Sequence, residues 1–172
     1  MEAETSKPGK QLTFDVSRTT IRSDHWLVEG VFMGLAEDLN AAWNSHDPDK
    51  VASFYAEDGV REEFIVTHAR LVGRTEIAAQ VQMYYQAMPD LSLSIRKVYS
   101  GDNFVSFEWM VNATHTGDIE GWPARGEAVT FPGASLLDVA ENGLISEERL
   151  YTDFTGLLAG AGLIPGLDPP TW

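Results

Sequence analysis

The sequence predicts an α+β protein in which three helices cover the concave face of a curved, mixed or antiparallel sheet and a short helix closes the chain. Apolar residues recur at helical spacing through much of the first half of the chain, whereas residues 91–152 alternate between apolar and polar. Helices that precede a run of strands joined by short turns are typical of this class. A strongly curved sheet of this kind would enclose a pocket.

The helices are predicted from their end signals and their spacing. Ser23 and Asp24 provide an N-cap for a long amphipathic helix. Asp47-Pro48 ends that helix and begins a short second one, because proline suits the first helical position behind an aspartate cap. Gly73–Thr75 begins a third helix, which Pro89-Asp90 stops. The long helix carries its apolar stripe at Leu27, Val31, Leu35, Leu39 and Trp43.

The strands follow from the period of two. Asp58-Gly59 is predicted to turn the chain into a first strand that runs through residues 64–66, and further strands are expected at 91–95, 103–116, 127–139 and 144–152. Pro132-Gly133 predicts a bulge or bend. Asn142-Gly143 predicts a type I′ hairpin turn.

The strand predicted at 103–116 has the clearest alternation. Its apolar face carries Val105, Phe107, Trp109, Val111 and Ala113, and the next residue on that face is His115. An ionisable ring at the end of an apolar row suggests a cavity with a polar mouth.

Composition narrows the possible partners. The formal net charge is −14 and no segment holds a Lys/Arg cluster, so we expect neither nucleic acid nor an anionic membrane as a partner. The chain has no cysteine, which fits a cytoplasmic protein. Neither a signal peptide nor a membrane-spanning stretch is expected. Residues 1–22 read as an N-terminal extension and 23–172 as a single domain.

Metal and cofactor signals are weak. The four histidines, at positions 25, 46, 68 and 115, form no pair with ligand spacing. Gly160-Ala-Gly162 lacks the preceding strand and the later glycine of a dinucleotide fingerprint, and no Gly-x-Ser-x-Gly elbow is present. We therefore expect no metal and no cofactor.

Several short motifs resemble those of the SnoaL-like polyketide cyclases, a group within the nuclear-transport-factor-2-like superfamily. Together they span about residues 25–165. The matching pieces, in order, are AWNSHDPDKV at 42–51, FYAED at 54–58, GRTEI at 73–77, MPD at 88–90, THTG at 114–117, GWP at 121–123, NGLI at 142–145, YTD at 151–153 and LLAGAGLIP at 157–165.

The resemblance implies a cone-shaped fold and cofactor-free acid–base chemistry on a hydrophobic small molecule. Cyclases of this group close a polyketide ring by intramolecular aldol condensation, using an aspartate on the last strand, and related epoxide hydrolases use the same position. That position corresponds to Leu150 here, and a second, histidine position corresponds to Leu136. The usual proton-transfer groups of the family are therefore absent from both positions.

Four residues are candidates for catalysis: His115, Glu148, Tyr151 and Asp153. His115 leads, because its pKa naturally lies near neutrality. Glu148 shares strand parity with Leu150 and would act as a general acid or base if it faced inward, but the default expectation for both Glu147 and Glu148 is a solvated surface carboxylate. Tyr151 could donate a hydrogen bond to a carbonyl or serve as a core aromatic residue. Asp153 is also a suitable helix cap.

An aromatic-rich cavity is expected. One of Glu62 and Glu63 could face it, but an acidic pair on the surface is the default expectation. Most of the aromatic residues also fit ordinary core positions, and Trp122 is an exception that could form a lid or a dimer contact. The predicted substrate-binding residues are Trp43, Tyr55, Glu63, His68, Tyr85, Trp109, Trp122, Leu136 and Leu150.

The first functional hypothesis is a cofactor-independent enzyme that acts by proton transfer on a hydrophobic carbonyl-bearing or polycyclic molecule, as a cyclase, isomerase or dehydratase. The second is a non-catalytic binding protein for a small molecule on the same scaffold, supported by Leu150. The third is a structural association domain with a filled cavity. A homodimer through the exposed sheet face is expected in each case.

Overall fold

The computed structural model describes residues 25–64, 68–119, 123–124, 126–160, 164 and 166. The expected N-terminal extension and the cap at Ser23-Asp24 lie outside these residues. The elements, in order, are α1 His25–Asn44, α2 Pro48–Ala52, β1 Tyr55–Glu63, β2 Arg70–Val72, α3 Arg74–Ala87, β3 Ser92–Gly101, β4 Phe104–His115, β5 Glu127–Val139, β6 Ile145–Thr152 and α4 Thr155–Gly160.

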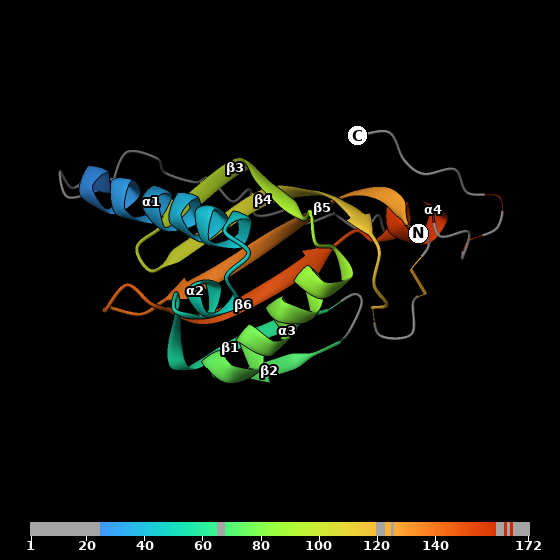
Figure 1. The fold of residues 1–172 in the computed structure, drawn as a ribbon. Helices are drawn as coiled ribbons and strands as arrows, with labels where there is room; N and C mark the ends of the chain where they lie inside the picture. Colours follow the sequence, from blue (N-terminus) through green and yellow to red (C-terminus); the bar gives the residue numbers. More distant parts are fainter. Residues whose placement is uncertain are drawn as a thin grey trace, which may run out of the picture.

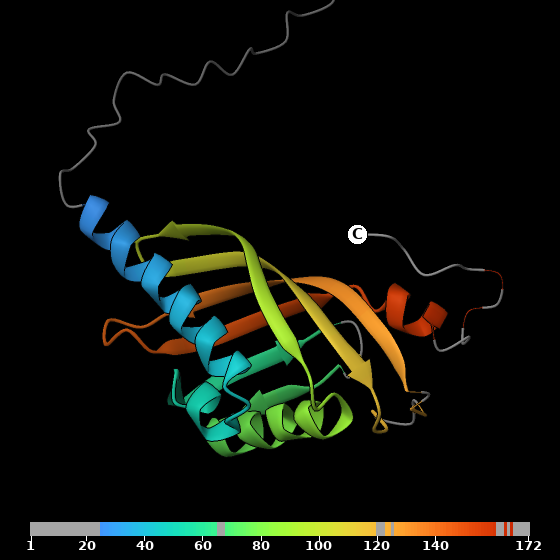
Figure 2. The ribbon, with the colours of Figure 1, turned by 45° about the horizontal axis from the view of Figure 1, so that its top comes forward.

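The strands form one six-stranded, curved and unclosed sheet in the order β2-β1-β6-β5-β4-β3. The pair β1 and β6 is parallel and the other neighbouring pairs are antiparallel. Helices α1, α2 and α3 lie on one side of this sheet, and α4 follows the C-terminal end of β6 (Figures 1 and 2). The predicted α+β class with a helix-covered, curved mixed sheet is confirmed.

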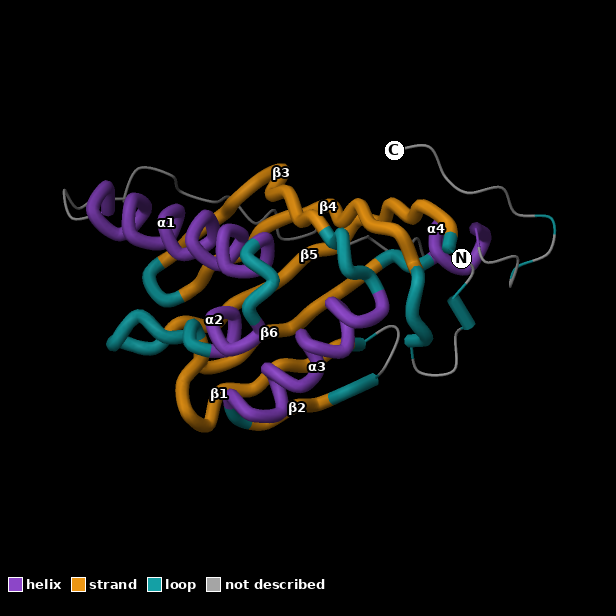
Figure 3. The backbone as a smooth tube through the Cα atoms, in the orientation of Figure 1, coloured by secondary structure: helices purple, strands orange, loops and turns teal. Residues whose placement is uncertain are grey.

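The helices contact different parts of the sheet. Helix α1 packs against β3 and β4, whereas α3 packs against β1 and β2, and the backbone trace shows both helices on the same face (Figure 3). The predicted cap of α2 is present, because Asp47 Oδ1 accepts a hydrogen bond from the backbone N–H of Lys50 at 3.0 Å, with Pro48 at the start of the helix. The space between these helices and the sheet holds the hydrophobic core.

The first strand begins earlier than predicted. It starts at Tyr55, so Asp58-Gly59 lies inside β1 instead of turning the chain into it. The pairing with β6 shifts register between Tyr55 and Val60. A Cβ atom at Gly59 would lie 2.9 Å from the carbonyl oxygen of Ile145, so the glycine permits this close backbone approach.

The hairpin between β5 and β6 is confirmed, but its predicted turn type is wrong. A type I′ turn needs positive φ at both central residues, whereas Gly143 has φ 81° and Asn142 is not among the described non-glycine residues with positive φ. The N–H of Gly143 donates to the carbonyl of Ala140, and Ala140 N–H donates to Leu144. Asn142 instead accepts a hydrogen bond from the Leu144 N–H at 3.1 Å, which stabilises the turn locally.

Of the bulge or bend predicted at Pro132-Gly133, the bulge is absent from the pairing of β5 with β4. β5 pairs with β4 in continuous register through Met110 opposite Pro132 and Trp109 opposite Gly133. A Cβ atom at Gly133 would collide with the indole of Trp109. The glycine therefore makes room for a large aromatic ring on the neighbouring strand.

Candidate functional site

A cavity lies between α1 and the inner face of the sheet. Its volume is about 50 Å³. Most of its lining is apolar or aromatic, and the polar groups come mainly from β1, β5 and β6. The lining residues are Leu39, Asn40, Trp43, Arg61, Glu63, Tyr84, Met88, Leu91, Leu93, Phe107, Trp109, Val111, Phe131, Ser135, Glu148, Leu150, Thr152 and Phe154.

An ion pair lies in the wall of this cavity. Arg61 on β1 is the register partner of Glu148 on the parallel strand β6. Arg61 Nε lies 2.9 Å from Glu148 Oε2, and the two side chains are only 4% and 5% exposed. Because water is excluded, each charge depends on the other for compensation.

The two carboxylate oxygens of Glu148 differ in their contacts. Oε2 accepts hydrogen bonds from the hydroxyl of Tyr55 and from Arg61 Nε. Within the described part of the chain, no hydrogen bond is found to Oε1. Glu148 is thus held by one oxygen and leaves the other available at the cavity wall.

Glu63 forms the second acidic position. Its oxygens accept hydrogen bonds from the Tyr84 hydroxyl, at 3.0 and 2.8 Å, and its Oε2 accepts one from Gln80 Nε2 at 3.2 Å. Gln80 Oε1 accepts in turn from Arg61 Nη1. A buried chain of hydrogen bonds therefore joins Glu63 to Glu148 through Gln80 and Arg61.

The environment fixes the protonation of the two donors to Glu148. Burial, and then the negative charge of Glu148, raises the pKa of Tyr55 well above its ordinary value of 10.0. Burial by itself lowers the pKa of Arg61, but the charge of Glu148 and the further contributions of Tyr55 and Glu63 raise it above its ordinary value. Near neutral pH, Tyr55 is therefore a neutral donor and Arg61 a fixed cation.

Two tryptophans line the cavity, Trp43 from α1 and Trp109 from β4. The Trp43 ring lies over the Arg61 guanidinium, 5.5 Å from centroid to Cζ, which is cation–π geometry. Trp109 Nε1 donates to Ser135 Oγ at 3.1 Å. Both rings therefore have polar contacts as well as apolar surface toward the cavity.

The sequence model of the SnoaL-like polyketide cyclases matches residues 34–160, more than half of the chain. The chain belongs to this family. No curated protein gives a significant match to the sequence.

Solved structures with the same fold come from several bacteria. AclR from Streptomyces galilaeus, titled a candidate hydroxylase, is 21% identical, with a TM-score of 0.70 over 81% of this chain and 89% of that chain. TsrD from Streptomyces laurentii is 19% identical, with a TM-score of 0.69 over 78% and 97% of the two chains. A candidate polyketide cyclase from Xanthomonas campestris is 24% identical, with a TM-score of 0.65 over 77% and 97%.

In this SnoaL-like protein, five of the predicted site residues line one cavity: Trp43, Glu63, Trp109, Glu148 and Leu150. Tyr55 contacts the site through its hydroxyl on Glu148. In each of the pairs Glu62/Glu63 and Glu147/Glu148, one side chain is buried and the other is not. Glu63 is 2% and Glu148 3% exposed, whereas Glu62 and Glu147 are partly exposed.

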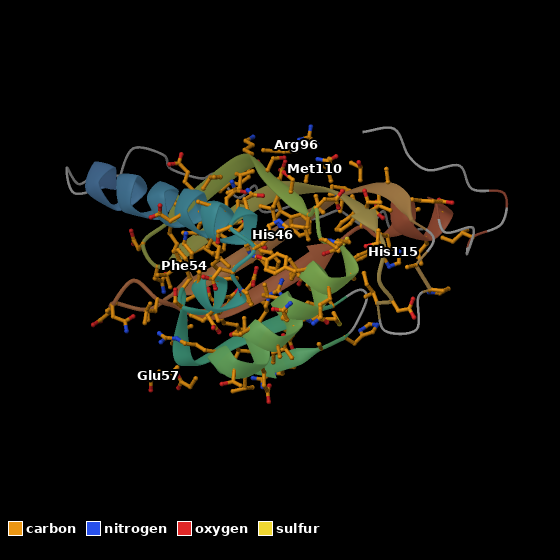
Figure 4. The ribbon with its side chains drawn as sticks, viewed as in Figure 1. His46, Phe54, Glu57, Arg96, Met110 and His115 are labelled. Carbon is orange, nitrogen blue, oxygen red and sulfur yellow. The ribbon has the colours of Figure 1, made fainter. Side chains whose placement is uncertain are left out.

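His115 lies apart from this cluster. Its side chain is buried, but it is not among the residues that line the cavity. The chain directly after it bonds to the end of α3, because the N–H groups of Thr116 and Gly117 donate to the carbonyl of Ala87. Figure 4 accordingly shows His115 near that end of α3. The inner face of β4 extends beyond the cavity, and His115 lies on the extension.

Three other predicted site residues, Tyr151, Leu136 and Asp153, do not line the cavity. Tyr151 is 41% exposed and stacks on Phe64, with ring centroids 5.1 Å apart, so it does not line the cavity. Leu136 is also absent from the lining, and its neighbour Ser135 takes the inward position. Asp153 Oδ1 accepts from the N–H of Thr155 at 2.9 Å and so caps α4.

The remaining expected residues lie elsewhere. Tyr85 donates its hydroxyl to the carbonyl of Trp43 at 2.8 Å and packs behind that ring instead of lining the cavity. His68 is exposed in the segment before β2 and is likewise not part of the lining. Trp122 lies outside the described residues.

Sequence reasoning missed four polar residues of the site: Asn40 and Ser135 in the cavity lining, and Arg61 and Gln80 in the hydrogen-bond chain. A signal for Arg61 was present, because it shares strand parity with Glu63. No comparable signal marks Gln80, whose place in the network depends on how α3 packs on β1.

Two further observations concern the described part of the chain alone. No group of three or more His, Asp or Glu side chains there is arranged to hold a metal ion. None of its helices is both long and apolar enough to cross a bilayer.

Proposed function

We propose that this protein catalyses proton transfer next to the carbonyl group of a hydrophobic small molecule, without a cofactor, and that Glu148 is the base. One observation carries the proposal: Glu148 is anchored through Oε2 by Tyr55 and Arg61, while Oε1 accepts no hydrogen bond from the described residues. A buried carboxylate with one positioned and one available oxygen is suited to accept a proton from a bound ligand.

The step is a proton abstraction at the carbon adjacent to the ligand carbonyl. Glu148 Oε1 accepts the proton, the C–H electron pair forms the enolate, and the negative charge moves to the carbonyl oxygen. Arg61 supports this charge, since Glu148 and Gln80 engage only part of its guanidinium. When the enolate is conjugated with a double bond, Glu148 returns the proton to the γ-carbon, which gives a double-bond isomer. Alternatively, the α-carbon of the enolate attacks a second carbonyl of the same molecule, which closes a ring. In ring closure, the new alkoxide takes the proton back from Glu148.

The apolar lining defines the class of substrate. Tryptophan, phenylalanine and leucine side chains surround the ion pair, so a largely apolar ring system gains by entering the cavity and displacing water. The limited free volume favours a small ligand over a large polycyclic one. Desolvation also strengthens the interaction between Arg61 and a developing oxyanion.

Proton abstraction can be measured without the natural substrate. The bicyclic ketone 1-tetralone has exchangeable hydrogens next to its carbonyl, and their replacement by deuterium in D₂O is followed by NMR. We expect the wild-type protein to accelerate exchange and Glu148→Gln to lose about 100-fold or more of this acceleration. Glu147→Gln, a change at the adjacent residue that does not line the cavity, is the matched control. Equal rates in the wild type and in Glu148→Gln would exclude Glu148 as the base.

Leu150 supports a second candidate, a non-catalytic binding protein. It places an aliphatic side chain inside the cavity at the position where the family resemblance implies an aspartate. Under this alternative, 1-tetralone or a related ketone would bind to the wild-type protein and to Glu148→Gln, but neither protein would accelerate deuterium exchange.

A homodimer and a cytoplasmic location remain predictions. The stacked side chains of Phe64 and Tyr151 are 39% and 41% exposed, and a second copy could cover them. Sedimentation of the wild type and of Tyr151→Lys tests this contact, with dissociation expected in the variant.

A further inference from the structure

One polar residue of the cavity has no role in the proton-transfer network. Asn40 belongs to α1, one residue after the buried Leu39 and one turn before Trp43, and all three line the cavity. This spacing places Asn40 on the helix face that covers the inner side of the sheet. Arg61 and Glu148, in contrast, belong to the sheet itself.

The amide oxygen of Asn40 is buried without a partner. Oδ1 is inaccessible to solvent and accepts no hydrogen bond from the described residues. A buried acceptor in this state costs the desolvation of the group without the compensating bond. Among the described residues, the other buried side-chain nitrogen or oxygen atoms without a hydrogen-bond partner are His115 Nε2 and Arg149 Nε, neither of which belongs to a residue of the cavity lining. Such a group requires an explanation, and a bound ligand supplies one.

We propose that Asn40 is a recognition residue for a hydroxyl group of the ligand. A hydroxyl donates to Oδ1 and can also accept from Nδ2, so it satisfies the amide in either of its two orientations. The inference rests on the proposed function, which places the ligand carbonyl at Arg61 and Glu148. The ligand is then a hydroxylated ketone whose carbonyl faces the sheet and whose hydroxyl faces α1.

The apolar surroundings make this contact selective. Leu39 and Trp43 flank Asn40 on the helix and cannot replace its hydrogen bond. A ligand without the hydroxyl leaves Oδ1 unpaired, whereas a ligand with the hydroxyl at the right position pairs it. Sites built in this way discriminate strongly against the analogue that lacks the polar group.

Binding of a ketone series tests the proposal. The probes are 1-tetralone and its 5-, 6- and 7-hydroxy derivatives, with affinity measured by quenching of tryptophan fluorescence. We expect at least one hydroxy derivative to bind wild-type protein about 10-fold more tightly than 1-tetralone. Asn40→Leu should abolish this preference and bind 1-tetralone at least as tightly. Glu37→Gln, at an exposed position one turn earlier on α1, is the matched control and should keep the preference.

A second measurement does not depend on the choice of ligand. Because Asn40→Leu replaces an unpaired buried acceptor with an apolar side chain, the free variant should have a higher Tm than the wild type. A lower Tm would assign Asn40 a structural role and overturn the proposal. A hydroxyl preference that survives in Asn40→Leu, or a series with no preference or no binding, would also overturn it. Deuterium exchange reports separately on Glu148, so a failure at Asn40 leaves the proton-transfer result intact.

Discussion

Arg61 and Glu148 are separated by 87 residues in the chain, yet Arg61 Nε lies 2.9 Å from Glu148 Oε2 on adjacent strands. The contact exists because β1 and β6 pair in parallel within an otherwise antiparallel sheet. It places one cation between two buried acidic side chains, Glu148 directly and Glu63 through Gln80.

Removing one partner of the Arg61–Glu148 ion pair should destabilise the protein more than replacing both partners. Arg61→Met leaves the Glu148 carboxylate buried without its cation and should lower the free energy of unfolding by about 3–5 kcal/mol. The double variant Arg61→Met, Glu148→Gln removes both charges and keeps an acceptor for the Tyr55 hydroxyl, so it should recover at least half of this loss. Urea denaturation of the two variants and of Glu148→Gln measures the coupling. Strictly additive losses would contradict it.

The Tyr55 hydroxyl should make the protein sensitive to alkali. Its pKa is raised in the folded state by burial and by Glu148, so above about pH 10 the unfolded chain loses this proton first. The unfolded state then binds fewer protons, and the free energy of unfolding must decrease as pH rises from there toward the folded-state pKa. We expect a shallower decrease in Tyr55→Phe, measured by urea denaturation at a series of alkaline pH values. The same slope in both proteins would show that Tyr55 does not contribute.

Gly133 should be intolerant of even a methyl group. Gly133→Ala would drive a Cβ atom into the indole of Trp109, so the ring must move into the cavity and strain its hydrogen bond to Ser135. We expect a loss of about 1–3 kcal/mol of stability, the range for an overpacked core. Gly101→Ala is the matched control, because no atom lies within 4 Å of a Cβ atom built there. Equal Tm values for the two variants would contradict the prediction.

An aspartate at position 150, which the family resemblance implies, should destabilise this protein. Leu150 is 5% exposed and is the register partner of Glu63, so Leu150→Asp brings a new carboxylate close to an existing one. Burial and this neighbour disfavour the charged form of the new side chain. Leu150→Asp should therefore be less stable than Leu150→Asn at about pH 7, with the difference shrinking toward about pH 4 as the new carboxyl takes up a proton. Thermal unfolding of both variants at the two pH values measures this, and a pH-independent difference would contradict it.

Local signals were sufficient for most of the elements. Asp47-Pro48 predicted the start of α2, and the alternation around Trp109 predicted β4 with its buried face. These features depend on neighbours within a few residues, so the sequence contains them directly. The inward position on β5 was predicted from the family resemblance alone, which implied Leu136 where the structure has Ser135.

The sequence by itself determined the α+β class, the family and an apolar interior with acidic residues near it. The tertiary structure decided which acids are buried, since Glu63 and Glu148 differ from Glu62 and Glu147 only by a one-residue step along a strand. It also decided that Arg61, Gln80 and Tyr84 surround them, and that His115 does not. The reason is physical: strand pairing and helix packing bring together residues that are distant in the chain, and the charges of the site acquire their partners only through those long-range contacts.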